Sequence, residues 1–216
     1  MFFKRNTPTL RKHHILKPYV EGRTLDIGYA SYPSPVAENF YGIDIQKIEP
    51  PQGYIEVKSV DLNHQEIPYE DGFFSTVLAI DTVEHLMSPL NLFLKVNKIL
   101  HMGGRFIICI PNPYFYKEII VNLFANKYIK PNCVPPEVAH INLPSRRIVR
   151  TLFHWSGFSL EKEVGINFPI PKTKIVTDMK RFPSISYEIM YIGKKITENP
   201  KFSIISKQKG VGWVNL

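Results

Sequence analysis

Short apolar runs separated by turn-forming residues dominate the first half of the chain. Four of them have the length and the β-branched or aromatic content of buried strands, at 24–27, 40–45, 54–61 and 73–81. A fifth run, at 105–110, is apolar almost throughout, as strands inside parallel sheets are. The pattern therefore predicts five strands before residue 111.

Helical periodicity occurs in two segments that follow these strands. Residues 89–100 repeat apolar side chains at close to 3.6-residue spacing, and Ser88 is suited to cap the start of this helix. Gly103 and Gly104 are expected to end it. A second helix is predicted over 145–155.

Two later strands complete the predicted sheet, at 158–165 and at 186–195. Strands that alternate with connecting segments favour right-handed crossovers. The expected fold is therefore α/β, a Rossmann-like doubly wound and mostly parallel sheet with an antiparallel closing strand. Because Pro33 and Pro35 leave little room for a helix after the first strand, the usual first helix must be short or reshaped.

The length of 216 residues fits a single domain, 1–216. Three segments are expected to stand apart from its core: a basic amino-terminal segment at 1–18, a proline- and aromatic-rich insertion or lid at 111–143, and a tail at 200–216. No apolar run is long enough to cross a bilayer, and the amino end lacks the apolar stretch of a signal peptide. The cytoplasm is therefore the expected compartment.

The net charge of +8 is concentrated at the two ends of the chain. Residues 1–18 carry five Lys or Arg and no acid, and residues 171–216 carry nine against three acids. The stretch between them has 13 basic and 16 acidic residues, so the centre is slightly acidic. Terminal charge of this kind is usually solvated, and no stripe of aromatic and basic residues resembles an RNA-binding module. A nucleic-acid partner is therefore not expected.

Four motifs occur in a characteristic order: LDIGYA at 25–30, YGIDI at 41–45, IDTVEHL at 80–86 and KILHMGGRFIICIPNP at 98–113. In this order they resemble the class I S-adenosylmethionine-dependent methyltransferase superfamily over about residues 22–165. The chain is most similar to members that act on sugars, lipids, quinones and other small molecules. The resemblance implies S-adenosylmethionine as the cofactor, bound in the crevice at the carboxyl ends of the strands.

The resemblance also implies which residues hold the cofactor. Gly28 forms a tight turn that lets backbone amides approach the ligand, and Asp26 orders that loop and the methionine amino group. Asp44 accepts hydrogen bonds from both ribose hydroxyls, and Asp61 and Leu62 lie at the adenine. The full expected set is Asp26, Gly28, Ala30, Asp44, Ile45, Asp61, Leu62, Asp81 and Thr82.

The loop after the first strand departs from the family's pattern. Ala30 stands where a second glycine is usual, and Tyr32 and Pro33 follow it. Alanine is small enough to allow binding, but Tyr32 and Pro33 could narrow the methionine end of the pocket. A catalytically silent binding or scaffolding domain is therefore the rival to an active enzyme. A nicotinamide dinucleotide is not expected, because the three-glycine fingerprint is absent.

Two histidines near the expected crevice, His140 and His85, are candidate catalytic residues. Methyl transfer is an in-line displacement, and a base becomes useful when the acceptor is a hydroxyl whose proton must leave. A histidine that titrates near neutrality can take that proton. Alternatively, His85 braces the loop after the fourth strand. Glu84 orders a histidine, binds a substrate hydroxyl or is a solvated acid.

No metal site is expected, since Cys109 and Cys133 lack ligand spacing and His13 and His14 have no neighbouring carboxylate or thiol. The expected function is methyl transfer from S-adenosylmethionine to an oxygen of a carbohydrate-like or other small polar acceptor. RNA methylation assisted by the basic ends is a weaker alternative.

Overall fold

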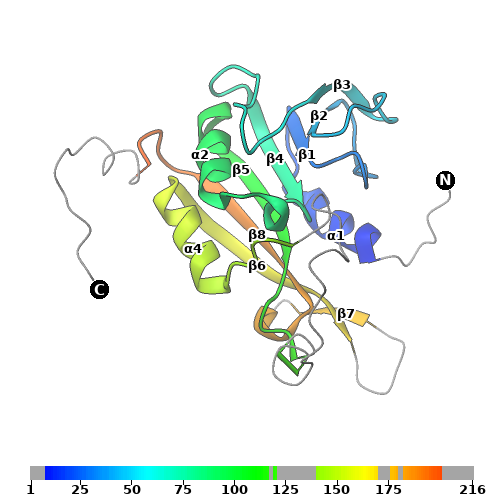
Figure 1. The fold of residues 1–216 in the computed structure, drawn as a ribbon, viewed down its shortest axis with the longest axis vertical. Coiled ribbons are helices and arrows are strands. Elements are labelled where there is room, and N and C mark those ends of the chain that lie inside the picture. The colour runs from blue at the N-terminus through cyan, green and yellow to red at the C-terminus, as the bar shows by residue number, and fades with distance from the viewer. Residues whose placement is uncertain (1–7, 117–118, 121–139, 170–175, 180–181, 201–216) are drawn as a thin grey trace.

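The computed structural model describes residues 8–116, 119–120, 140–169, 176–179 and 182–200. Within these ranges, eight strands form one sheet in the order β3-β2-β1-β4-β5-β8-β6-β7 (Figure 1). Strands β1 to β5 run parallel to one another. Strand β8 is antiparallel to both β5 and β6, and β6 is antiparallel to β7. The strands are β1 Thr24–Ile27, β2 Phe40–Asp44, β3 Tyr54–Ser59, β4 Phe74–Ile80, β5 Leu100–Pro111, β6 Phe158–Pro169, β7 Val176–Met179 and β8 Glu188–Lys195.

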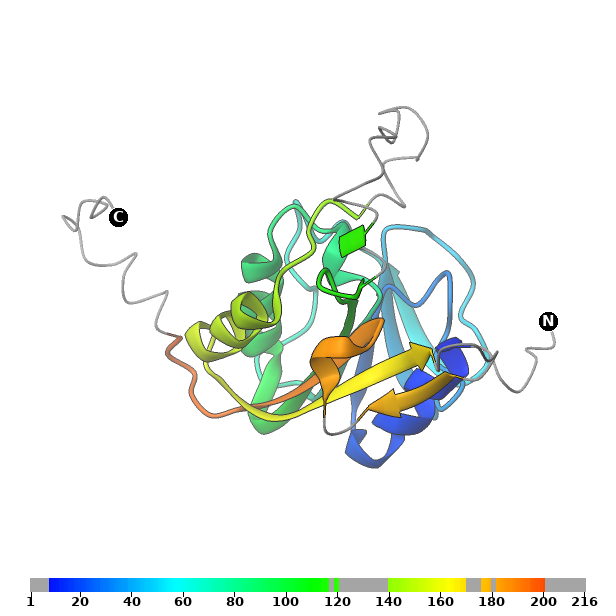
Figure 2. The same ribbon diagram turned by 90° about the horizontal axis from the view of Figure 1, so that it is seen from below.

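Helices cover both faces of the sheet (Figures 1 and 2). Helices α2 and α4 lie on one face, and α1 lies on the other. Ser88 and Ser145 cap α2 and α4 by accepting hydrogen bonds from Asn91 N and Ile148 N. The helices are α1 Pro8–Leu16, α2 Pro89–Ile99 and α4 Arg146–Trp155, with short 3₁₀ turns η1 Lys17–Tyr19, η2 Val83–His85 and η4 Pro183–Ile185.

Alternation along β5 divides the core between the two faces of the sheet. Phe106 and Ile108 point into the cluster under α2 and α4, whereas Ile107 and Cys109 point into the cluster under α1. The run at 105–110 is therefore apolar because its strand is buried on both sides. The predicted α/β fold, with its mostly parallel sheet and antiparallel closing strand, is confirmed.

The first helix was expected to be short or reshaped because of Pro33 and Pro35, and the connection between β1 and β2 in fact contains no helix but turns and bends over residues 28–39. Tyr29 fills the space against the sheet instead. Its ring packs over Gly42, where an added Cβ would lie 2.7 Å from the ring, and its centroid is 5.3 Å from that of Tyr54. The usual helix is thus replaced by an aromatic side chain held against the sheet.

Two predictions about local structure were wrong. The helix predicted over 89–100 is confirmed as α2, Pro89–Ile99, but Gly103 and Gly104 do not end it, because β5 begins at Leu100 and includes both glycines. The backbone turns extended there because Leu100 is already buried in the core. The charge of segment 1–18 is not entirely solvated, since Lys12 and His13 on α1 are buried against the sheet.

Other expected segments fall mostly outside the described residues. Most of the insertion at 111–143, including Cys133, lies there, as does the tail beyond residue 200. Among the helices that are described, none combines the length and the apolar character required to cross a bilayer.

Candidate functional site

The carboxyl ends of β1 and β4 meet at Gly28 and Thr82. Gly28 has φ +81°, which favours glycine, and a Cβ added there would lie 2.3 Å from the Thr82 hydroxyl oxygen. The Thr82 hydroxyl donates to the carbonyl of Ile27 at 3.0 Å. Any side chain at position 28 would therefore push these strand ends apart.

Asp44 at the end of β2 is tied to the loop after β1. Its carboxylate accepts the backbone N–H of Ala30 at 3.1 Å through Oδ2 and that of Gln46 at 2.8 Å through Oδ1. A carboxylate has about four acceptor sites, and two of them receive no donor from the part of the chain that the structure describes, which leaves them to ligand hydroxyls. The half-buried Asp44 therefore fits the predicted ribose contact, and Ala30 supports it through its backbone.

Ile45 follows Asp44 at the end of β2, and Asp61 follows the end of β3. Asp61 contacts His64 Nδ1 at 2.7 Å and accepts the N–H of Asn63 at 2.9 Å, and the His64 contact lowers the pKa of Asp61. Ile45 is 59% exposed, and Leu62 packs against the core. Apolar groups and a carboxylate are the residue types that an adenine ring with its exocyclic amine requires.

Asp26 is buried beneath this edge, where the Tyr54 hydroxyl donates to its Oδ2 at 2.5 Å. The Ser34 N–H donates to the Tyr54 oxygen at 2.8 Å, and the Ser34 hydroxyl lies 3.0 Å from Nδ1 of His13. Burial raises the pKa of Asp26 to about 7, even though the hydrogen bond from Tyr54 lowers it. Asp26 thus orders the loop from within, through a chain of polar contacts that ends on α1.

A buried ion cluster joins α1 to the ends of β4 and β8. The Lys12 ammonium contacts Asp81 Oδ2 at 2.5 Å and Glu188 Oε1 at 2.7 Å, and Asn167 donates to the other Glu188 oxygen at 2.8 Å. Burial alone would lower the pKa of Lys12, but the surrounding negative charge outweighs burial and raises it. Asp81 is therefore bound by the protein's own ammonium.

Glu84 and His85, in the turn η2 after β4, come together with His140. One ligand atom from each lies within 4.8 Å of the others, and the two imidazole centroids are 5.0 Å apart. Glu84 is 1% exposed, and its burial raises its pKa to about 8. The predicted pair of histidines is thus brought together, with Glu84 beside them rather than in solvent.

Asn142 fixes this arrangement. Its backbone N–H donates to the Glu84 carbonyl at 3.0 Å, and its side-chain amide donates to the carbonyls of Leu86 and Met87. These bonds hold the segment that carries His140 against the turn that carries His85.

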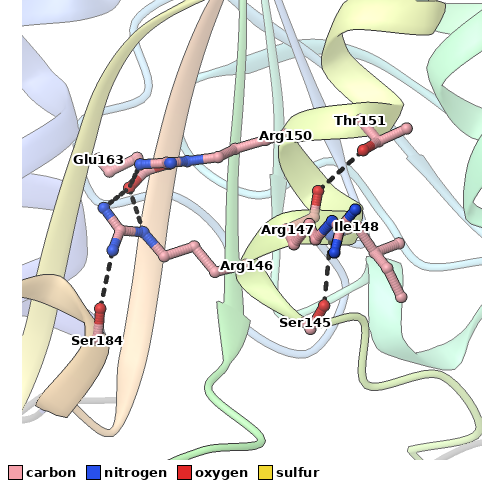
Figure 3. A network of polar contacts seen from close by, with 8 residues as sticks. All are labelled: Ser145, Arg146, Arg147, Ile148, Arg150, Thr151, Glu163 and Ser184. Carbon is pink, nitrogen blue, oxygen red and sulfur yellow. Dashed lines mark hydrogen bonds and ion pairs between the residues drawn. The ribbon is translucent and has the colours of Figure 1, made fainter.

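Two open hollows on the described surface lie away from this edge. One is lined by α4 residues, including Arg146, Arg150 and Trp155, and the other lies beside β3 around Tyr69. Figure 3 shows that both arginines already point at Glu163 on β6, and Arg146 also donates to Ser184. Both guanidinium groups therefore share the single Glu163 carboxylate, which fixes their positions within the fold.

The sequence missed five residues of this region: Lys12, His13, Tyr54, Asn142 and Glu188. Each acts through a partner far away in the chain, so no local motif marks it.

A family model described as a methyltransferase domain matches residues 11–163. No curated protein matches the sequence.

Solved structures share the fold at low sequence identity. An S-adenosylmethionine-dependent methyltransferase from Thermotoga maritima, described as a possible histamine N-methyltransferase, is 18% identical with a TM-score of 0.66, over 87% of this chain and 89% of that one. One from Archaeoglobus fulgidus is 17% identical with a TM-score of 0.61, over 88% and 96%. The [4+2]-cyclase SpnF is 12% identical with a TM-score of 0.56, over 87% and 81%, so the shared fold alone does not fix the reaction.

Proposed function

We propose, from the premise that this chain belongs to the methyltransferase domain family, that it transfers the methyl group of S-adenosylmethionine to an oxygen atom of a small polar acceptor. S-adenosylmethionine is the cofactor that the family implies. The oxygen acceptor, carbohydrate-like in character, is our own inference.

The cofactor's place is supported by Gly28 and Asp44. The backbone at Gly28 leaves no room for a side chain, and Asp44 retains acceptor sites toward the same edge. Tyr32, which the sequence suggested might narrow the pocket, is 56% exposed. Asp61, Ile45 and Leu62 then serve the adenine, and Thr82 and Asp81 lie toward the methionine end.

The acceptor side is assigned to His85 and His140, and their convergence is the observation that carries the proposal. An acceptor oxygen attacks the methyl carbon while the carbon–sulfur pair stays on sulfur, which gives S-adenosylhomocysteine. The hydroxyl proton must leave, and an adjacent neutral imidazole can receive it. Two imidazoles and a carboxyl in one place suit hydroxyl groups better than an already nucleophilic amine.

A silent binding domain is the second candidate, and one observation favours it. Asp81 is engaged by Lys12, and α1 reaches into the strand ends where the methionine moiety would lie. If that contact never opens, the family's fold would persist without its cofactor.

The test is transfer of labelled methyl from S-adenosylmethionine to a panel of sugars, polyols and phenols. We expect incorporation with at least one hydroxyl acceptor, reduced about 100-fold in His140→Ala because a positioned base contributes roughly 10²–10⁴ in rate. His101→Ala is the matched control, since His101 is exposed at the opposite end of β5 and contacts only the carbonyl of Met102 among the contacts described. Equal loss in both variants would contradict the assignment.

A further inference from the structure

Glu84, His85 and His140 also form a donor set that binds metals. One carboxylate oxygen and two imidazole nitrogens lie within 4.8 Å of one another. Ligands around tetrahedral zinc sit roughly 3.3 Å apart, so a small closing movement of the side chains is enough. Two histidines with one carboxylate suit divalent first-row transition metals and leave coordination positions open.

Glu84 supplies a second, independent observation. Its side chain is almost fully buried, and Oε2 has no hydrogen-bond partner within the described part of the chain. A buried carboxylate oxygen without a donor is costly, and a cation between it and the imidazoles would satisfy it.

We propose that Glu84, His85 and His140 bind one divalent transition-metal ion, typified by Zn²⁺, whose open coordination positions take the acceptor hydroxyl. Metal binding by these three residues does not depend on the proposed function. That the open coordination positions take an acceptor hydroxyl does rest on the proposed function. The sequence suggested no metal site, because the third ligand comes from a segment far along the chain.

The cation changes how the hydroxyl is activated. Coordination lowers the pKa of the bound hydroxyl, so its proton can pass to solvent before transfer. The oxygen lone pair then forms the new bond to the methyl carbon, and the carbon–sulfur pair remains on sulfur. In the loaded protein the histidines act as ligands, and the cation replaces them as the activating group.

Asn142 is a positioning residue for this site. It holds the His140 segment to the backbone of residues 84–87 without offering a ligand atom itself. Its removal should loosen the third ligand and leave the other two in place.

The test is calorimetric titration of the full, tag-free chain with ZnCl₂ in chelator-treated buffer, with Co²⁺ absorption in the visible as a report of coordination. We expect one equivalent to bind, with affinity lowered about 100-fold or more in His140→Ala and in Glu84→Gln. Asn142→Ala should lower it about 10-fold, as loss of a supporting contact does. His101→Ala should match the unaltered protein.

Circular dichroism should show that each variant is folded, and His140→Gln provides a second, milder change at the exposed ligand. No zinc binding, or equal binding by the unaltered protein and both His140 variants, would overturn the site. S-adenosylmethionine titrated in EDTA separates the two proposals. Cofactor binding without zinc binding would support the proposed methyltransferase function and reject the metal site. Zinc binding without cofactor binding would support the metal site and reject the proposed function.

Discussion

The face of the sheet under α2 and α4 is packed mainly by aromatic rings and buries one ammonium, that of Lys195, against the carbonyls of Asn97 and Leu100. The opposite face, under α1 and residues 28–39, buries a network of charged and polar side chains. Phe93, Phe106, Phe153 and Phe158 interlock on the first face, with ring centroids 4.9–5.9 Å apart. On the second face, α1 places Lys12 and His13 among hydrogen-bonding partners.

This difference between the two faces suggests that one mainly stabilises the fold and that the other responds to bound ligands. Apolar packing keeps its free energy whatever the pH or ligand, because it involves no titrating group. Buried ionic contacts respond to protons, to ions and to ligands that compete for the same partners. The face under α1 is therefore where binding can be coupled to the fold, and it adjoins the candidate site.

The largest effect is expected for Phe153→Ala on the aromatic face. Phe153 is fully buried, so the cavity and lost burial should lower the free energy of unfolding by about 3–5 kcal/mol. Urea unfolding measures this change, and cofactor affinity of the folded fraction should be unaltered. A change below about 1 kcal/mol would show that this face is not the apolar support of the fold.

Lys12→Met is expected to act next most strongly, on the opposite face. The substitution leaves the carboxylates of Asp81 and Glu188 without their cation. The free energy of unfolding should fall by about 3 kcal/mol, which is the lower end of the range for buried ion pairs because Asp81 is partly exposed. The control is Lys98→Met, whose ion pair with Asp71 is 3.8 Å long and exposed, with little expected change. Thermal unfolding compares the two, and similar shifts would contradict the buried cluster.

Asp26 should make stability pH-dependent. Its folded pKa of about 7 is raised above the ordinary value, so its contribution is full below about pH 4 and is lost as the pH rises through 7. Between pH 5 and 8 this loss should be roughly 2 kcal/mol. The pKa of Glu84 is raised as well, so Glu84 adds a pH dependence of the same sign. The effect of Asp26 is therefore measured as the difference in the free energy of unfolding between the unaltered protein and Asp26→Asn at each pH. Parallel pH profiles for the two would reject the raised pKa.

The smallest effect is expected for Arg150→Ala. Its guanidinium is half exposed, and Arg146 remains paired with Glu163 after the change (Figure 3). The free energy of unfolding should fall by less than about 1 kcal/mol, and by less still in high salt. Urea unfolding at low and high ionic strength measures the change in the free energy of unfolding. A loss as large as that of Lys12→Met would contradict the claim that exposed ion pairs contribute less than buried ones.

The mostly parallel α/β arrangement and most element bounds followed from local pattern, whereas the spatial order of the strands came from the structure. Apolar runs and capping serines predicted β1, β4, α2 and α4 within a few residues, because burial and capping act on neighbours in sequence. The prediction that Gly103 and Gly104 end the helix was wrong. Glycines often end helices, but here both lie within β5, which begins at Leu100. Helix α1 and β7 were missed, because neither has a strong apolar period.

The candidate site was predictable only where a motif is contiguous. Gly28, Asp44 and the Asp81–His85 turn lie at strand ends that the sheet brings together, so their order along the chain was informative. Lys12, Tyr54 and Glu188 meet through tertiary packing alone. Local sequence carries no record of such contacts, and only the structure revealed them.

The central claim is that S-adenosylmethionine binds at the carboxyl ends of β1 and β2, with its ribose on Asp44. Calorimetric titration of the folded chain with S-adenosylmethionine and S-adenosylhomocysteine tests it most directly. We predict micromolar binding of both, weakened about 10- to 100-fold in Asp44→Ala, as expected for lost hydrogen bonds to a charged group. Absence of binding, or equal binding by Asp44→Ala, would contradict the account.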